Sequence, residues 1–447
     1  MDNQSTPKTE LLEFIPQPSR PPVITTDGLI GRMRKHLFSN IWNTLLTISV
    51  FTLLFMLIKP FLEWAVFDAV WSAANRRECL NASPDGACWP GVIDWVNGLI
   101  YGRYPGDQQW RVNLGFGLGL IWLVPLAFKQ VQQKILIALS AIILFPFLAN
   151  YLFLGGSDHR FNYIVACVAL AYLLILYVNI ALTSLGHKTP GESLELLIGR
   201  FYQKRAALLG RLLFWLIVTV PIIFTFRNLT LVLVEVDAWG GLFLTLIISG
   251  FSIVMALPIG ILLALGRRSH MPVFKWLSIC IIELVRSVPL ITVLFMSVTM
   301  LPLFFPNTIQ LNKLAQVLVA VCVFAGAYMA ETVRGGLQGI PPGQFEAAKS
   351  VGLGYWYTMA FIILPQALRA MIPNIVTSFI SLFKDTTLVS IIGLFDIMLM
   401  ARNISIDKNW LGLHTEPLIA ISILFFVFCY SMSQYSHRLE KKLKKSR

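Results

Sequence analysis

Apolar stretches long enough to cross a lipid bilayer recur along most of this 447-residue sequence. A helix needs about 20 apolar residues to cross the hydrocarbon layer, which is about 30 Å thick. Only 13% of the residues are charged, whereas about 25% are charged in an average soluble domain. Because lipid cannot bond backbone polar groups, runs of this length are expected to be helices. The sequence therefore predicts an all-α, polytopic membrane protein.

Windows of about 19 residues predict about ten spans. They cover residues 38–60, 110–128, 135–154, 161–184, 212–233, 241–265, 277–301, 314–336, 361–383 and 417–435. Pro221 and Arg227 interrupt the span at 212–233. An even number of spans places both termini on the same side of the membrane.

The basic residues predict which side that is. With both termini inside, the inner segments hold 22 Lys and Arg, and the outer loops hold seven. Inner loops rich in Lys and Arg are typical of the cytoplasmic side, so we expect a multi-pass protein of the bacterial inner membrane with both termini cytoplasmic. The net charge of +13 then reflects topology, and no nucleic-acid partner is expected. The basic end could also contact membrane lipid.

The chain divides near residue 236 into two halves with five predicted spans each. The predicted regions are a cytoplasmic tail (1–37), a membrane extension (38–235) with an outer loop (61–109), a core (236–435) with an inner loop (337–360), and a basic cytoplasmic tail (436–447). The extension carries no recognisable chemistry.

Cys79 and Cys88 lie in one polar segment, ECLNASPDGACW, within the outer loop. Disulfides form in oxidising compartments such as the periplasm. The two cysteines are therefore a disulfide candidate, and two free thiols are the alternative. The other four cysteines lie inside apolar runs, where cysteine behaves as a small hydrophobic residue.

The inner loop contains a short polar segment, Gln344 to Val351, that is bracketed by Pro341-Pro342-Gly343 and by Gly352. Proline and glycine at these positions start and stop a helix. The segment predicts a short helix outside the bilayer, with Ala347 and Ala348 on an exposed face that another protein can approach closely. A linker helix on the membrane surface is the alternative.

This loop resembles the EAA loop of ABC-importer permeases. Seven residues occupy that family's spacing: Glu346, Ala347, Ala348, Gly352, Ile362, Leu364 and Pro365. The resemblance implies a coupling helix that docks into a groove of a cytoplasmic ATPase. The implied ATPase-coupling residues are Gln344, Glu346, Ala347, Ala348, Gly352, Leu364 and Pro365.

The resemblance extends over residues 239–435, a little under half of the chain. ELVRSVPLI, AYMAETVRGG, LPQALR and LFKDTTLVSIIG look like the polar amino-acid branch, and the extra N-terminal spans look like its longer, general L-amino-acid subgroup. One departure is Ser287-Val288, where many members have Gly-Thr. The resemblance implies a five-helix permease core, amino acids as cargo and four partners: two cytoplasmic ATP-binding subunits, a related second permease subunit as heterodimer partner, and a periplasmic amino-acid-binding protein.

Charged residues inside two predicted spans repeat one spacing. Glu283 and Arg286 are three residues apart, as are Glu331 and Arg334, so each pair shares a helix face. Ionisable groups in membranes usually face a bundle interior or a wet cavity. These residues predict either a polar part of the translocation pathway or a structural ion-pair network.

Lys384, Asp385 and Thr386 follow the apolar run of span 361–383, at its outer end. The resemblance implies a gate or substrate contact in the translocation pathway there. The alternative is an ordinary capping motif, in which Asp385 or Thr386 starts a helix.

Other chemistry is absent from the sequence. There is no G-x-x-x-x-G-K-[ST] phosphate loop, so we expect no ATP and no other cofactor in this chain, and ATP in a partner subunit. The six histidines are dispersed and predict no metal site. No catalytic residues are identified, and we expect no enzyme activity. A secondary transporter or channel driven by an ion gradient remains the alternative function.

Overall fold

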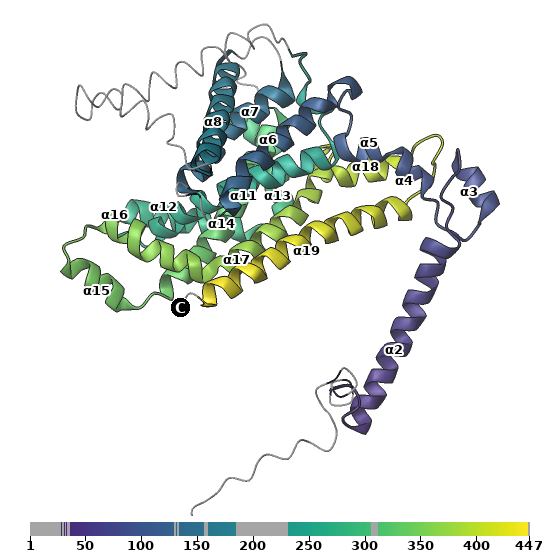
Figure 1. Cartoon of the computed structure of the whole chain (residues 1–447), viewed down its shortest axis with the longest axis horizontal. Coiled ribbons are helices and arrows are strands. Elements are labelled where there is room, and N and C mark those ends of the chain that lie inside the picture. Colours follow the sequence, from purple (N-terminus) through teal and green to yellow (C-terminus); the bar gives the residue numbers. More distant parts are fainter. Residues whose placement is uncertain are drawn as a thin grey trace, which may run out of the picture. The chain divides into compact units, whose positions relative to one another are not determined.

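A computed structural model describes residues 36–128, 134–155, 160–184, 231–304 and 312–445, together with residues 28, 31, 33 and 131. Across these residues the regular elements are helices, and β-pairing is limited to isolated bridges. The chain divides into two compact units, residues 1–71 with 77–87 (unit 1) and residues 72–76 with 88–447 (unit 2). The all-α, polytopic prediction is confirmed (Figure 1).

Unit 1 contains one long helix, α2 (Ile41–Leu62), which continues through a π-helical turn, η1 (Glu63–Phe67). None of the side chains of α2 is buried. Asn40 caps its first turn by accepting a hydrogen bond from the backbone N–H of Ile41. The short helix α3 (Arg76–Ala82) follows.

Unit 2 contains the remaining helices. In chain order these are α4 (Pro90–Asp94), α5 (Val96–Tyr101), η2 (Gly106–Gln108), α6 (Gln109–Ala127), α7 (Lys134–Leu154), α8 (Arg160–Ser184), η3 (Val236–Ala238), α11 (Gly241–Arg267), α12 (Pro272–Ser287), α13 (Leu290–Thr299), η4 (Leu301–Phe304), α14 (Lys313–Gln338), α15 (Pro342–Ser350), α16 (Tyr355–Tyr357), η5 (Thr358–Ile363), α17 (Leu364–Asp385), η6 (Thr386–Ile392), α18 (Ile397–Ile404) and α19 (Thr415–Lys445).

Six of the described helical segments are long and apolar enough to cross a membrane. They are Ile41–Phe67, Leu136–Leu154, Gly241–Arg267, Lys313–Gln338, Tyr355–Ile392 and Thr415–Lys441, and each matches a predicted span. The predicted spans at 110–128 and 161–184 are the helices α6 and α8, although neither is among the six. The predicted span at 212–233 lies largely outside the described residues.

The predicted span at 277–301 is not one continuous helix. Instead α12 and α13 are separate helices that meet at an angle of 107°. The cause is Pro289, since proline disfavours the helical conformation in the residue before it. Val288 is accordingly extended, with φ −112° and ψ 137°. The pair forms either a broken span, which would agree with the predicted span, or a re-entrant loop.

The centre of unit 2 is the contact between α11 and α14. Small residues allow the two backbones to approach closely, as is usual between membrane helices. A Cβ atom added at Gly260 would lie 2.7 Å from the Cβ of Met329. Ala256 and Ala264 of α11 and Ala327 of α14 are almost fully buried. This pair is the framework around which α12, α13 and α17 pack.

The extension forms its own packed group of α6, α7 and α8, held by one buried arginine. Arg111 is fully buried. Its Nε donates to the carbonyl of Leu152 at 2.6 Å, and its Nη1 donates to the carbonyl of Val232 at 2.9 Å. A cation near a helix C-terminus is favourable, so Arg111 stabilises the end of α7 and fixes the strand-like segment that leads into the core.

The outer segment of the extension packs on the core. Trp410 donates from Nε1 to Asp94 at 3.0 Å, and the Arg103 guanidinium lies 3.7 Å from the ring centre of Phe395. Gly241, at φ +62°, donates its backbone N–H to the carbonyl of Phe395 at 2.7 Å. The division near residue 236 stays a prediction, and the contacts of Asp94 with Trp410 and of Arg103 with Phe395 cross it.

Candidate functional site

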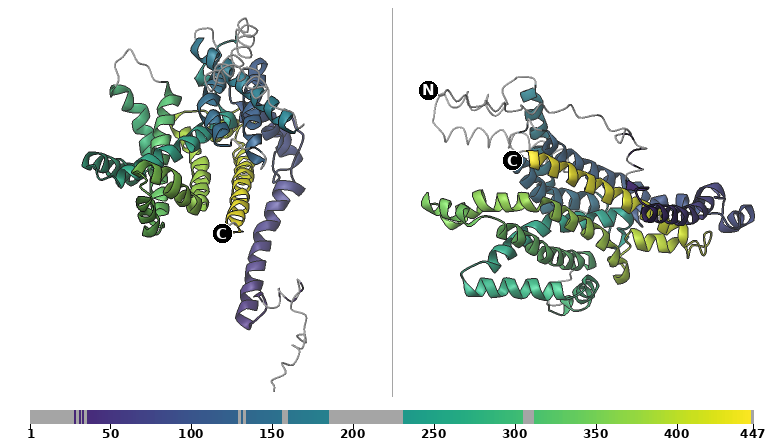
Figure 2. Two further views of the ribbon diagram at one scale, coloured as in Figure 1. Left: turned by 60° about the vertical axis from the view of Figure 1, so that its left-hand side comes forward. Right: turned by 90° about the horizontal axis from the view of Figure 1, so that it is seen from below.

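The polar segment of the inner loop is helix α15, which lies at one extremity of unit 2 beyond the ends of its neighbouring helices (Figures 1 and 2). Pro341 precedes it in extended conformation, and Pro342 occupies its first turn, where the missing N–H costs nothing. Gly352 ends it at φ +76°. The backbone N–H of Leu353 then bonds to the carbonyl of Ala348 at 3.1 Å, which completes a glycine cap.

The two alanines of α15 lie on different faces. Ala347 is exposed, whereas Ala348 is only 3% exposed and shares the inner face with Phe345. The prediction that both form one exposed face is therefore wrong for Ala348, because adjacent helical residues point about 100° apart. The outward face instead contains Gln344, Ala347 and Val351, spaced three and four residues apart and all exposed.

Two contacts hold α15 against the ends of the membrane helices. The Arg268 guanidinium, just after α11, lies 5.7 Å from the ring centre of Phe345, and its Nη1 donates to the carbonyl of Leu337 at 3.3 Å. Gln366 of α17 donates from Nε2 to Oε1 of Gln344 at 3.3 Å. A movement of α15 would therefore displace residues at the ends of α11, α14 and α17.

Leu364 and Pro365 begin α17, directly after the π-helical turn η5. Proline cannot donate the backbone hydrogen bond of a regular α-helix, and irregular turns of this kind are frequent at functional sites. Leu364 is half-buried and Pro365 is exposed. The structure thus places both of them at the junction between the loop and the membrane helix.

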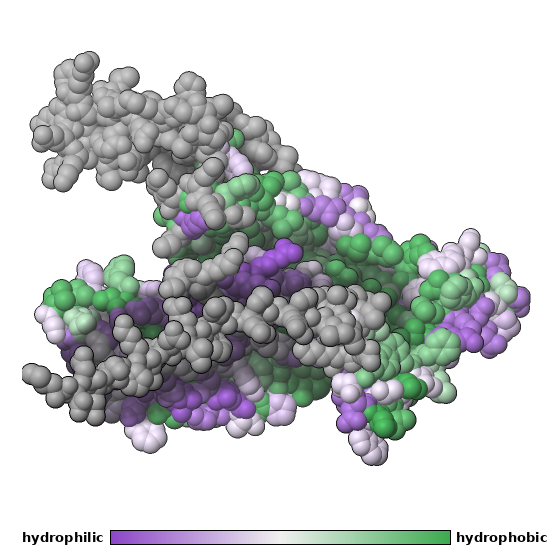
Figure 3. All heavy atoms as spheres, turned by 60° about the horizontal axis from the view of Figure 1, so that its bottom comes forward, coloured by the Kyte–Doolittle hydropathy of each residue, from purple (hydrophilic) through white to green (hydrophobic). Residues whose placement is uncertain are grey.

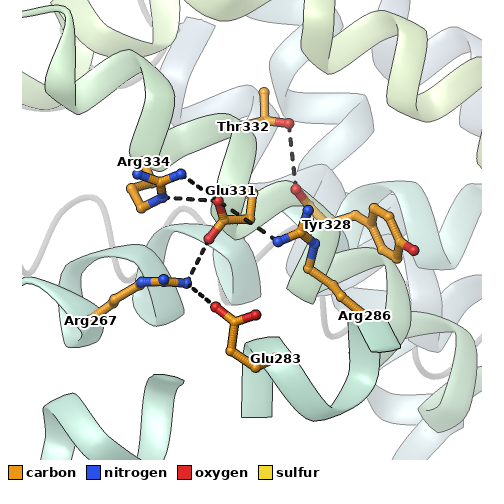
Figure 4. A network of polar contacts seen from close by, with 7 residues as sticks. All are labelled: Arg267, Glu283, Arg286, Tyr328, Glu331, Thr332 and Arg334. Atoms are coloured by element: carbon orange, nitrogen blue, oxygen red, sulfur yellow. Dashed lines mark hydrogen bonds and ion pairs between the residues drawn. The ribbon is translucent and has the colours of Figure 1, made fainter. Parts of the chain in front are cut away.

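The charged residues of the spans converge on one carboxylate (Figure 4). Glu331, which is 16% exposed, accepts hydrogen bonds from Nε and Nη2 of Arg334 at 2.9 and 2.7 Å. Its other oxygen lies 2.8 Å from Nη1 of Arg267. Arg286 approaches at 3.8 Å, and its guanidinium also lies 5.3 Å from the ring centre of Tyr328. One carboxylate therefore joins three arginines.

The partners differ from the sequence expectation in one respect. Glu331 pairs with Arg334 as the spacing predicts. Glu283 pairs instead with Arg267, at 2.9 Å, and no ion pair joins Glu283 to Arg286 in the described part of the chain. The reason is that Arg267, at the end of α11, is within reach of both acids. Sequence reasoning missed Arg267 because it counted this residue only as an inner-loop charge.

The network connects three helices, α11, α12 and α14. Its three arginines exceed its two glutamates by one positive charge. The Nε atom of Arg286, one of these three arginines, is buried and has no hydrogen-bond partner among the described residues. The geometry supports the structural alternative, in which the ion pairs hold the helices together. A role in the translocation pathway stays a prediction.

At the C-terminal end of α17, Thr386 is buried and Lys384 is exposed. The helix runs directly into η6, and Asp385 is in the helical region, with φ −66° and ψ −17° and no capping hydrogen bond. The capping alternative is therefore wrong for Asp385. Thr386 bonds from Oγ1 to the carbonyl of Phe383, one turn back in α17, at 2.7 Å.

A buried carboxylate that sequence reasoning missed lies at the start of α18. Asp396 is fully buried, and its Oδ1 accepts a hydrogen bond from the backbone N–H of Leu399 at 3.0 Å. Its Oδ2 has no partner in the part of the chain that the structure describes. Burial raises the pKa of Asp396 to about 7. An aspartate directly before a helix is a capping signal, but the burial of Asp396 could not be read from sequence.

Cys79 and Cys88 are both disulfide-bonded, and the other four cysteines form no disulfide. Within the described residues, no group of three or more His, Cys, Asp or Glu could hold a metal ion.

The disulfide has a direct test. A membrane-impermeant thiol reagent applied from outside should label the chain at Cys79 and Cys88 only after reduction, because disulfide sulfurs do not react with it. The C79S/C88S double variant should lose this reduction-dependent increase and serves as the control. Equal labelling before and after reduction would contradict the bond.

These features define a multi-pass, all-α membrane protein with an exposed helical loop between two of its spans. Residues 256–445 match the family model of the binding-protein-dependent transport system inner membrane component. The chain is 39% identical to the inner membrane amino-acid ABC transporter permease protein YhdY of Escherichia coli, over 97% of this chain and 98% of that protein. It is 38% identical to the glutamate/glutamine/aspartate/asparagine transport system permease protein BztC of Rhodobacter capsulatus, over 100% of this chain and 99% of that protein.

Among solved structures, the chain is similar to an amino acid ABC transporter with histidines, at 28% identity and a TM-score of 0.40, over 44% of this chain and 90% of that one. The chain belongs to the family of binding-protein-dependent inner-membrane transport components, and it is a permease subunit of an ABC importer. This membership decides against the carrier or channel driven by an ion gradient.

Proposed function

We propose that this permease carries amino acids, and that its cargo is a broad set of polar ones. The proposal is supported by its similarity, over nearly the whole of both chains, to a permease named for amino acids and to one named for glutamate, glutamine, aspartate and asparagine. A cell that lacks the importer should lose uptake of such amino acids, and re-expression of the complete chain should restore it.

The proposed assembly has four further components. Two cytoplasmic ATP-binding subunits bind and hydrolyse ATP, and this chain itself holds no cofactor. A related second permease subunit completes the pathway, and a periplasmic binding protein delivers the amino acid. Both termini are cytoplasmic in this proposal, which the excess of Lys and Arg in the inner segments supports.

The observation that carries the coupling proposal is the outward face of α15. Ala347 and Val351 are exposed together, whereas Phe345 is held by Arg268 and Gln344 by Gln366 of α17. A helix that is anchored on one face and exposes small and apolar side chains on the other can enter a groove of a partner protein. We assign this groove to the ATP-binding subunit.

Arg267 and Arg268 give the coupling a route into the membrane helices. The two arginines are adjacent in sequence. Arg268 contacts Phe345 of α15, and Arg267 forms ion pairs with Glu283 and Glu331. A displacement of α15 would therefore be passed to α11, α12 and α14 together. Switching a two-state equilibrium almost completely takes about 5.5 kcal/mol of differential binding, which closure of the ATPase around α15 would supply.

The pathway assignment of Lys384 gains support from the rest of α17. Asn374, Thr377, Ser381 and Lys384 are all exposed and follow one another at intervals of three or four residues, so they form a stripe along one face. Polar side chains in a membrane helix face a wet cavity or another helix more often than lipid. In this proposal the stripe, with Asp385 and Thr386 at its outer end, faces the path of the amino acid.

The Ala347→Arg substitution tests the docking face. A long charged side chain at the centre of the exposed face should prevent close approach of the partner, so co-purification of the ATP-binding subunit in mild detergent should fall at least about tenfold, the effect of losing about 1.4 kcal/mol of binding. Amino-acid uptake should fall in parallel.

Ala82→Arg is the matched control, because Ala82 is an exposed alanine at the end of α3, in the loop that the proposed topology assigns to the periplasm. This variant should retain the ATP-binding subunit and transport normally. If A347R retains both as well, α15 is not the docking element. Transport by the purified chain alone in liposomes would contradict the proposed function as a whole.

A further inference from the structure

A groove of about 470 Å³ lies between α11, α17 and α19. Its lining is apolar except for one arginine: Leu257, Pro365, Leu368, Arg369, Ile372, Ile375, Val376 and Leu439. Figure 3 shows that hydrophobic and hydrophilic residues both form extended areas on one face of the molecule. The groove is the right size for a small ligand, and its apolar wall excludes a polar one.

The length of the groove matches one leaflet of a bilayer. Its lining on α17 extends from Pro365 to Val376, which is about 16 Å at 1.5 Å per residue. Half of a hydrocarbon layer about 30 Å thick is about 15 Å. The groove begins at the end of α17 that adjoins α15 and ends near the middle of the span, so it covers the depth that a lipid acyl chain occupies.

Positive charge gathers at that same end. Arg369 lines the groove, is exposed, and makes no hydrogen bond or ion pair with any described residue. On α19, Arg438 directly precedes the lining residue Leu439, and Lys441 is one turn from Arg438. Both of these side chains are exposed. Glu440, the acid beside them, has Nδ1 of His437 at 3.9 Å, which is an ion pair only when the histidine is protonated. One cation, Arg369, therefore lines the groove, and two more lie on the adjoining turn of α19.

We propose that this groove binds an anionic phospholipid of the leaflet that faces α15. One acyl chain lies against Leu368, Ile372 and Val376, and the phosphate-bearing headgroup pairs with Arg369, while Arg438 and Lys441, on the turn of α19 that contains Leu439, add positive charge nearby. Basic pockets between membrane helices are known to hold anionic headgroups in this way. The bound lipid joins α17 to α19 at the end of the bundle from which α15 extends.

The test uses the complete importer in mild detergent and compares phosphatidylglycerol with phosphatidylcholine carrying the same acyl chains. Native mass spectrometry titrations should show preferential binding of phosphatidylglycerol to the wild type. Arg369→Gln should weaken this binding about fivefold, and Arg438→Gln with Lys441→Gln should weaken it further, because each basic residue contributes about 1 kcal/mol near an anionic surface. Binding of phosphatidylcholine should not change in these variants.

Two further variants keep the result interpretable. Lys408→Gln removes an exposed lysine elsewhere in the chain and should leave phosphatidylglycerol binding unchanged. Val376→Trp fills the groove and should weaken binding of both lipids. Equal binding of the two lipids by the wild type, or unchanged phosphatidylglycerol binding in R369Q, would overturn the proposal. Loss of the second permease subunit in V376W, with lipid binding intact, would show that the groove is a protein interface instead.

Discussion

Replacing Gly352 with valine should reduce amino-acid uptake about five- to thirtyfold while the protein remains in the membrane. Gly352 is at φ +76°, a conformation that costs an ordinary L-residue about 1–2 kcal/mol and a β-branched residue more. A factor of 5–30 in an equilibrium corresponds to that energy. No heavy atom lies within 4 Å of where the new Cβ would be, so the expected cause is backbone strain that displaces the end of α15, and not a clash.

Radiolabelled uptake, normalised to the amount of permease in the membrane, measures this effect. Gly352→Asn is the matched variant, because asparagine tolerates the left-handed conformation better than other non-glycine residues, and it should retain most of the activity. Gly354→Val is a second control, since Gly354 is in extended conformation at φ −68° and valine fits that backbone. If G352V and G354V behave alike, the left-handed cap of α15 is not needed for coupling.

Replacing Glu331 with glutamine should be the most destabilising single change in the ion-pair network. The variant leaves three arginines without the carboxylate that joins them. Removing one partner of a buried ion pair costs about 3–5 kcal/mol, and we expect the lower end, about 3 kcal/mol, because the arginines are partly exposed. Thermal unfolding of the purified permease should show a clear fall in the melting temperature.

Glu283→Gln is the control, because it removes the other glutamate of the same network, which has fewer arginine partners than Glu331. Glu283 is 56% exposed and forms one ion pair among the described residues, with Arg267, so its loss should cost less than about 1 kcal/mol. The double variant E331Q/R334Q removes one charge of each sign and should recover part of the stability. An E331Q protein with unchanged melting temperature and abolished uptake would favour the translocation-pathway alternative over the structural one.

Much of this protein is determined by local sequence patterns. The length and apolarity of runs such as 241–265 and 314–336 predict membrane helices without reference to the rest of the chain, because the bilayer imposes the length and the absence of water imposes the helix. Helix α15 is equally local, since Pro342 and Gly352 restrict the backbone by their own chemistry. These elements could be predicted because their causes lie within a few residues of each other.

The tertiary structure decided which side chains meet. The spacing of Glu283 and Arg286 permits an ion pair between them, but Glu283 pairs with Arg267 of α11 instead. Arg267 reaches this position only because α11 packs against α14, where it also pairs with Glu331. Arg111 likewise bonds carbonyls 41 and 121 residues further along the chain. Hydrogen bonds and ion pairs depend on distances of a few ångströms, and those distances between remote residues are set by helix packing, which no local pattern in this sequence contains.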